Sequence, residues 1–201
     1  MAAAAALDTN RLQASFQRLG GDPASLRQWQ ELRENARHLD DADKLRRVNE
    51  FFNRRIAFTD DSQAWGQSDY WATPMETLAR RQGDCEDFSI AKYFTLLEAG
   101  VAPARLRLVY VKARIGGPAS GLQQAHMVLA YYPAPDAEPL VLDNLITEIR
   151  PASRRPDLLP VFSFNNQGIW QGAAGTQGPG GAGRLSRWQD LLQRAQQEGF
   201  D

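Results

Sequence analysis

The side chain best suited to nucleophilic chemistry is Cys85, the only cysteine in this chain of 201 residues. It follows Gly83 and Asp84 and opens the apolar segment DCEDFSIAKYFTLLEAG, so we expect it in the first turn of a buried helix. Partial positive charge at a helix N-terminus lowers the pKa of a thiol and favours the nucleophilic thiolate. The alternative is an inert buried thiol, which is the usual state of a lone cysteine.

A nucleophilic cysteine needs a base, and the chain has only two histidines, His38 and His126. His38 falls on a predicted helix beside acidic residues and is expected to be a solvated surface residue. His126 opens the predicted strand HMVLAYY, and Asp143 lies in the next one, PLVLDNL. A carboxylate can fix the tautomer of a histidine base. In an antiparallel pair, the numbers of two directly paired residues always add up to the same sum. His126 and Asp143 lie on the same face of the sheet if that sum is odd, for example 269, and on opposite faces if it is even. The sequence does not fix this register.

Three carboxylates, Asp84, Glu86 and Asp87, surround the cysteine and would raise its pKa. In one interpretation Asp84 and Asp87 simply cap the helix, which the spacing alone favours. In the other, a hard cation, with calcium as the first candidate, binds oxygen ligands that include Asp84 and Glu86. The segment is not an EF-hand loop, because the ligand ladder and central glycine of that motif are absent.

The elements that must position these residues form an α+β pattern. Amphipathic periodicity predicts helices within about residues 8–57, and a catalytic core would span about 58–170. In that core a short helix precedes the buried one, and β-rich segments follow at 106–115, 126–132 and 139–145. Residues 172–183 read as a flexible glycine-rich loop, and residues 184–198 as a last amphipathic helix. We expect a single domain over residues 1–201.

Composition narrows the possible functions. Apolar residues make up 43% and charged residues 23%, which excludes wholesale disorder. Lys and Arg number 23 against 24 Asp and Glu, so no global basic field favours nucleic acid or an anionic membrane. No apolar run is long enough to span a bilayer, and the start MAAAAALDTN does not resemble a signal peptide. Either the protein is cytosolic or an export signal has been removed from it. A lone cysteine excludes an internal disulfide and any multi-cysteine metal site.

The motifs GDCEDF, AHMVL and VLDN, within a match over about residues 25–170, resemble the bacterial transglutaminase-like cysteine peptidases of the LapG type. The resemblance implies a papain-like, transglutaminase-like α+β fold. It also implies a triad in which Cys85 is the nucleophile, His126 the base and Asp143 the residue that orients it.

The same resemblance implies calcium as the cofactor and reverses the preference for capping. Asp84 and Glu86 become the expected ligands, with Asp87 and Asp61 as weaker candidates. The oxyanion would be held by the Cys85 N–H and by a donor from the aromatic loop that contains Trp65 and Trp71.

LapG-type enzymes are periplasmic peptidases that cut a large repeat adhesin (LapA-like) near its N-terminus, at a small-residue site with paired alanines, and so disperse the biofilm. An inner-membrane receptor for cyclic diguanylate (LapD-like) sequesters them. The resemblance therefore implies these two partners and a periplasmic location, with neither nucleic-acid binding nor membrane insertion. Two alternatives stay open at this point. One is a transglutaminase that transfers the acyl group to an amine, and the other is a non-catalytic calcium-dependent binding module.

Overall fold

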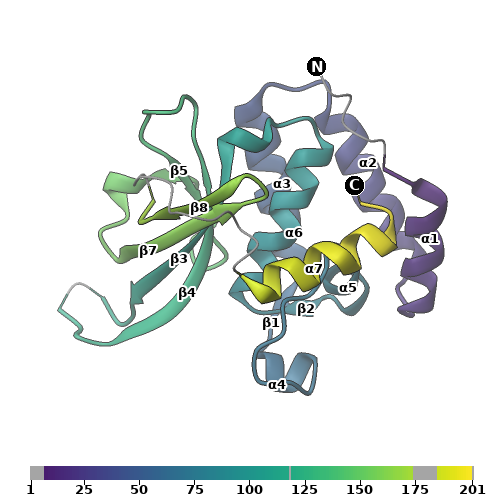
Figure 1. The fold of residues 1–201 in the computed structure, drawn as a ribbon, viewed down its shortest axis with the longest axis horizontal. Coiled ribbons are helices and arrows are strands. Elements are labelled where there is room, and N and C mark those ends of the chain that lie inside the picture. Colours follow the sequence, from purple (N-terminus) through teal and green to yellow (C-terminus); the bar gives the residue numbers. More distant parts are fainter. Residues whose placement is uncertain (1–6, 118, 174–184, 201) are drawn as a thin grey trace.

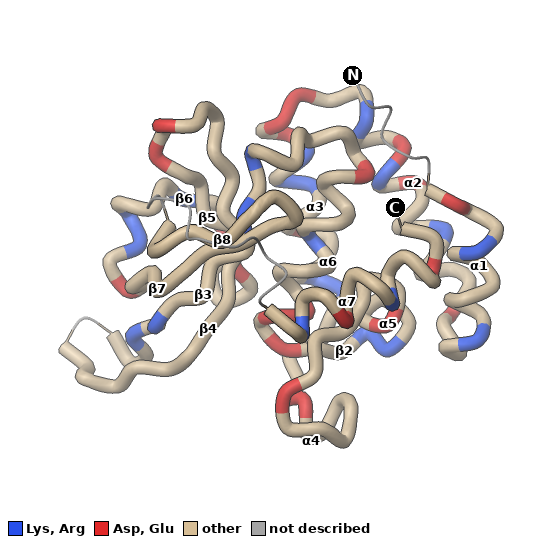
Figure 2. The backbone as a smooth tube through the Cα atoms, viewed as in Figure 1, with Lys and Arg blue, Asp and Glu red and all other residues tan. Residues whose placement is uncertain are grey.

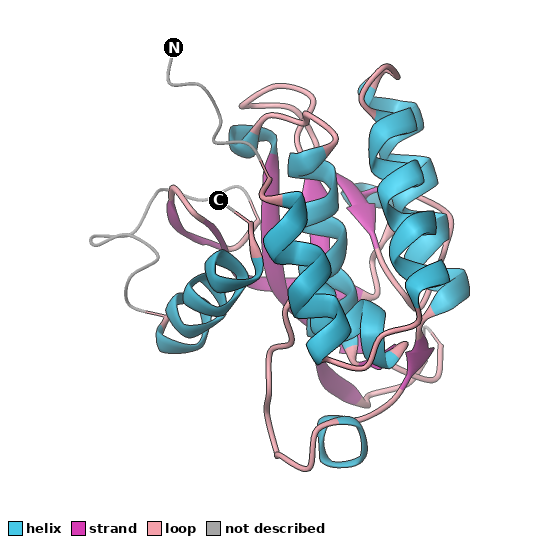
Figure 3. Ribbon diagram, turned by 90° about the vertical axis from the view of Figure 1, so that its right-hand side faces the viewer, coloured by secondary structure: helices cyan, strands magenta, loops and turns pink. Residues whose placement is uncertain are grey.

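The buried segment after Gly83 is the central helix of the fold. In this computed structural model, which describes residues 7–117, 119–173 and 185–200, helix α6 (Cys85–Glu98) lies between a group of helices and one face of a sheet (Figures 1 and 3). Almost every α6 side chain after Glu86 is buried, because apolar residues occupy nearly all sides of the helix. The sequence prediction of a central helix beginning at the cysteine is confirmed.

Six further α-helices are described, and most of them lie on the side of α6 away from the sheet (Figure 1). They are α1 (Thr9–Arg18), α2 (Pro23–Ala36), α3 (Asp41–Arg55), α4 (Asp61–Ala64), α5 (Pro74–Arg80) and α7 (Ser186–Glu198). Two of them begin as their sequences require, since Pro23 and Pro74 occupy first-turn positions where no donor is lost. Thr73 and Glu76 complete a capping box at the start of α5. Among the described residues, no helix has the length and apolar character needed to cross a bilayer.

An antiparallel sheet forms the second layer, with strand order β6-β5-β4-β3-β7-β8. Its strands are β3 (Leu106–Arg114), β4 (Gln123–Tyr131), β5 (Leu140–Leu142), β6 (Arg150–Pro151), β7 (Leu158–Asn165) and β8 (Gly168–Gln171). One face packs on α6 through Leu108, Met127 and Leu129, and the opposite face carries a smaller valine-rich cluster. The β7–β8 hairpin and β6 were not predicted from the sequence.

Two short parallel strands hold the segment that leads into the cysteine. Strand β1 (Ala57–Phe58) pairs with β2 (Gln82–Gly83) directly before α6. Gly83 passes so close to Asp87 that an added Cβ would lie 2.7 Å from the Asp87 side chain. A side chain at position 83 would therefore displace the first turn of α6.

The last helix docks on the core instead of remaining free. Trp188 is fully buried against Tyr93, Phe94 and Phe164, and Thr73 donates a hydrogen bond to Glu198 Oε1 at 2.8 Å. Residues 174–184, which hold most of the predicted glycine-rich loop, lie outside the described residues.

Glu198 gives α7 a pH-dependent attachment. Burial raises the pKa of Glu198 to about 7 from 4.5, so stability is lost as pH rises between these values, because the unfolded chain releases the proton first. We expect Glu198→Gln to raise the free energy of unfolding by about 2–3 kcal/mol at pH 8 and by much less at pH 5. Urea denaturation at both pH values measures this. The exposed Glu31→Gln is the matched control, and equal effects at both pH values would contradict the assignment.

Candidate active site

Cys85 occupies the first position of α6, and its side chain is 9% exposed. The thiol donates a hydrogen bond to Glu86 Oε2 at 2.8 Å. Burial, the negative charges of Glu86 and Asp84 and this hydrogen bond raise the pKa of Cys85, while a main-chain hydrogen bond from Met127 lowers it. The helix start alone therefore does not ionise the thiol, and a base or a neutralising positive charge is needed.

Met127 places the cysteine beside the strand that carries His126. In the antiparallel ladder, Ile115 donates to the Leu122 carbonyl and Tyr132 donates to the Arg105 carbonyl. Because bonding alternates along an antiparallel pair, even-numbered residues of β4 bond to β3 and odd-numbered ones face the other edge. At that edge the Met127 carbonyl accepts from Ser89 Oγ at 3.1 Å. Helix α6 thus occupies, beside Met127, the position that β5 occupies beside Leu129 and Tyr131.

His126 and Asp143 form a buried pair. His126 Nε2 lies 2.8 Å from Asp143 Oδ1, and the two residues are 6% and 1% exposed. Since a carboxylate only accepts, Nε2 is the donor and Nδ1 remains available as an acceptor. Burial opposes ionisation of Asp143, but its bonds to His126 and Arg155 hold its pKa at about 2. The carboxylate is therefore charged at neutral pH.

The strand register differs from the example considered from the sequence. Leu129 pairs with Leu142 and Tyr131 with Leu140, a sum of 271 where 269 was the example. The sum is odd, so the pair shares a face as the hypothesis required. Asp143 lies one residue beyond β5 and not inside a strand. It is thus diagonal to His126, within reach of a histidine side chain.

Two buried basic side chains, Arg155 and Lys92, lie near Asp143 and were not predicted from the sequence. Arg155 Nη2 lies 2.7 Å from Asp143 Oδ2 and 2.7 Å from Asp157 Oδ2, with its side chain 1% exposed. Lys92 is buried on α6, where desolvation lowers its pKa to about 7 against the opposing charge of Asp143. No spacing rule links these residues to Asp143, because Arg155 follows an irregular loop and Lys92 reads as a core position.

Arg155 should matter for stability. Removing one partner from a buried ion pair leaves the other charged and unpaired, which costs about 3–5 kcal/mol. We expect Arg155→Met to lower the free energy of unfolding by about that amount in urea denaturation, with Asp143 and Asp157 left uncompensated. The neighbouring exposed Arg154→Met should change it by no more than about 0.5 kcal/mol. If both substitutions changed the free energy of unfolding by the same small amount, the Arg155–Asp143 ion pair would contribute little to stability.

The acidic residues gather where α4, β2 and the start of α6 meet, as the red segments of Figure 2 show. Ligand atoms of Asp61, Asp84 and Asp87 all lie within 4.8 Å of one another, and Asp84, Cys85 and Glu86 form a second such group. Burial and the neighbouring carboxylates raise the pKa of Asp84 to about 9. Burial also raises the pKa of Asp87 to about 7 and that of Asp61 above its ordinary value.

These carboxylates fit a hard cation. Asp84 caps α6, since its Oδ1 accepts from the Glu86 and Asp87 amides, and the Asp87 carboxylate accepts a main-chain hydrogen bond from Asp84 in return. The Asp87 carboxylate also accepts from the Ala72 N–H and the Trp65 indole. Asp61 Oδ1 is buried and has no hydrogen-bond partner among the described residues. Clustered oxygen donors with one orphaned buried oxygen are suited to calcium.

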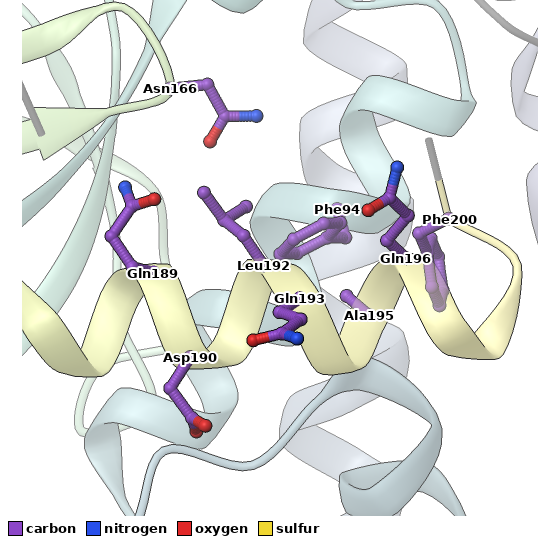
Figure 4. A pocket seen from close by; sticks show the side chains of 9 residues that line it. All are labelled: Phe94, Asn166, Gln189, Asp190, Leu192, Gln193, Ala195, Gln196 and Phe200. Carbon is purple, nitrogen blue, oxygen red and sulfur yellow. The ribbon is translucent and has the colours of Figure 1, made fainter. Parts of the chain in front are cut away.

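The remaining sequence candidates lie around this centre. The Trp65 indole N–H is engaged by Asp87 at 3.1 Å, and Trp71 stacks on Phe164. His38 is exposed just beyond α2. A hollow of about 590 Å³ beside α7 is lined by Phe94, Leu192 and a rim of amide side chains (Figure 4). None of the candidate site residues lines it.

A cysteine at the start of a central helix, packed on an antiparallel sheet that carries a histidine–aspartate pair, defines the transglutaminase-like cysteine protease fold. The sequence profile described as bacterial transglutaminase-like cysteine proteinase matches residues 25–173. The chain belongs to this family, so the fold and family expected from the sequence are confirmed.

Solved structures support the same family membership. Legionella pneumophila LapG is 36% identical, with a TM-score of 0.79 over 97% of this chain and 100% of that one. A calcium-bound form of that protein is 39% identical, with a TM-score of 0.76 over 92% of this chain and 97% of that one. An EGTA-treated form is also similar, with 36% identity and a TM-score of 0.79 over 96% and 100%. No curated protein matches the chain.

Proposed function

We propose that this protein is a calcium-dependent cysteine endopeptidase in which Cys85 is the nucleophile, His126 the base and Asp143 its orienting carboxylate. The observation that carries the proposal is the buried His126–Asp143 pair, whose side chains are 2.8 Å apart. His126 lies directly before Met127, and the Met127 main chain hydrogen-bonds the Cys85 thiol. Membership of the cysteine proteinase family supports the same assignment.

The chemistry follows from the tautomer. His126 Nδ1 takes the Cys85 proton, and the thiolate sulfur bonds to the scissile carbonyl carbon. When the tetrahedral adduct collapses, the C–N bond breaks and the imidazolium gives its proton to the leaving amine. His126 then removes a proton from water, which attacks the thioester and releases the sulfur. The Cys85 N–H at the helix start is one donor to the oxyanion.

Calcium would have a structural role and would not act on the substrate. Asp61, Asp84 and Asp87, with Glu86 beside them, would hold calcium, by analogy with the calcium-bound Legionella protein. Its charge would neutralise the carboxylates that oppose ionisation of the thiol. The ligand Glu86 is also the acceptor of the thiol hydrogen bond, so its coordination would release Cys85 for His126.

The substrate, location and regulation are carried over from the LapG type. We propose that the enzyme acts in the periplasm on the N-terminal region of a large repeat adhesin and so releases the adhesin and promotes biofilm dispersal. A cyclic-diguanylate receptor of the inner membrane would sequester it. The 36% identity to LapG along the full length of that chain supports this reading.

The test is incubation of the protein with the N-terminal segment of a candidate adhesin, with and without calcium, followed by sequencing of the product ends. A new N-terminus that forms only with calcium is the expected result. Incorporation of a primary amine into glutamine residues without chain cleavage would instead identify a transglutaminase. An intact segment that binds the protein in a calcium-dependent way would identify a binding module.

A further inference from the structure

The edge of β4 that contains Met127 continues past the active site without a strand partner. Strand β4 pairs with β3 from Gln123 to Tyr131, but β5 covers only Leu129 to Tyr131. The β3–β4 hairpin therefore extends beyond β5, as Figure 1 shows. Among the described residues, no strand pairs with this edge between Gln123 and Val128.

The hydrogen bonds between β3 and β4 determine which main-chain groups of β4 point toward its other edge. Even-numbered residues of β4 bond to β3, so the N–H and C=O groups of Gln123, Ala125 and Met127 all point outward. Those of Met127 are used by α6, through the Cys85 thiol and Ser89 Oγ. The N–H and C=O groups of Ala125 lie on the same edge, two residues before Met127 and about 7 Å from the Met127 groups beside the thiol. Ala125 is exposed.

This edge also lacks the usual protection. Exposed edges are commonly blocked by proline or by charged side chains, which prevent another chain from pairing. The free part of β7 carries Pro160 in this way. In contrast, the exposed residues of β4 are Gln123, Gln124 and Ala125, which are uncharged and none of which is proline.

We propose that the edge of β4 at Gln123–Ala125 binds the polypeptide substrate as an added strand, with the Ala125 N–H and C=O pairing to substrate peptide groups next to the scissile bond. The inference rests on the proposed function, because it assumes that Cys85 attacks a peptide carbonyl. Recognition is then largely of extended main chain, a mode in which backbone hydrogen bonds supply affinity and alternate side chains supply specificity. The occupant is a substrate segment that is extended and unfolded at the cleavage point.

The test uses the peptide aldehyde acetyl-Ala-Ala-Ala-alaninal on the calcium-loaded protein. The Cys85 sulfur bonds to the aldehyde carbon, the C=O π bond breaks, and the thiol proton passes to the oxygen, which gives a hemithioacetal without another reactant. Amide hydrogen exchange is then followed by NMR on the labelled protein. In the free protein, the Gln124 and His126 amides should exchange slowly because they bond to β3, and the Ala125 amide should exchange fast.

Adduct formation should slow exchange at Ala125 by at least about tenfold. Acetyl-alaninal, which occupies Cys85 but lacks the extended chain, is the control and should slow it much less. N-methylation of the longer aldehyde should weaken binding at alternate amides only, as strand pairing has a period of two.

The outcomes are separable. Failure of every aldehyde to form an adduct at Cys85 would refute the proposed nucleophile, and the strand proposal with it. An adduct that leaves Ala125 exchange unchanged, or equal effects of N-methylation at successive amides, would overturn the strand proposal and leave the peptidase intact.

Discussion

Replacement of His126 by alanine is expected to reduce peptide-bond cleavage by about 10³-fold or more, because the Cys85 thiol would lose the group that removes its proton. The loss of cleavage should be nearly complete in this protein. The carboxylates of Glu86 and Asp84 raise the thiol pKa, so little thiolate forms without a base. Cys85→Ala should be at least as inactive. Cleavage of a peptide substrate at neutral pH, measured as kcat/KM, gives both values.

His38→Ala is the matched control, since it removes the only other histidine, which is exposed. It should retain full activity. A thiol-directed peptide electrophile should label Cys85 in the wild type and in His38→Ala, and label His126→Ala far more slowly. Equal labelling of all three proteins would show that Cys85 does not depend on His126, and the enzyme assignment would lose its mechanism.

Chelation of calcium is expected to abolish cleavage while Cys85 stays chemically intact. The cause is the close approach of the carboxylates of Asp61, Asp84 and Asp87, which a bound cation would stabilise in their charged form and in one arrangement. Activity should return when calcium is added in excess, and mass spectrometry should find the thiol unmodified throughout. Full cleavage in excess chelator would remove calcium from the mechanism.

A pair of neighbouring substitutions tests the ligand set. Asp61→Asn should weaken calcium binding by about 10-fold or more in isothermal titration calorimetry, because it removes a charged ligand with an orphaned buried oxygen. Asp60→Asn, one residue away and exposed, should leave the affinity unchanged. Equal affinities in the two variants would place the cation elsewhere.

The predicted and observed structures agree where local pattern decides the outcome. The position of Cys85 follows from a cap residue and an apolar helix, and that of His126 from a β-rich segment, so both could be placed from the sequence. The register that brings Asp143 to His126 could not, because it depends on β5, which is only three residues long. The class of fold was available mainly because GDCEDF, AHMVL and VLDN resemble a known family.

Long-range polar contacts account for most of what was missed. Arg155 reaches Asp143 from an irregular turn, and Tyr70 donates its N–H to Asp61, nine residues earlier, across a loop without periodicity. Strand β7 contains Pro160, and its register against β3 shifts between Phe162, which pairs with Tyr110, and Pro160, which pairs with Val111, so its alternating pattern is interrupted. Such contacts are set by how the elements pack, and no spacing rule records that packing.

The bond from the Trp65 indole to Asp87 Oδ2 gives the protein an intrinsic optical reporter. Indole emission responds to charge and solvent at the ring, and Asp87 belongs to the group of carboxylates formed with Asp61 and Asp84. Occupancy of the cation site should therefore be readable in the fluorescence of this one tryptophan among five, without any added dye. Filling and emptying of the centre could then be followed in real time, separately from catalysis.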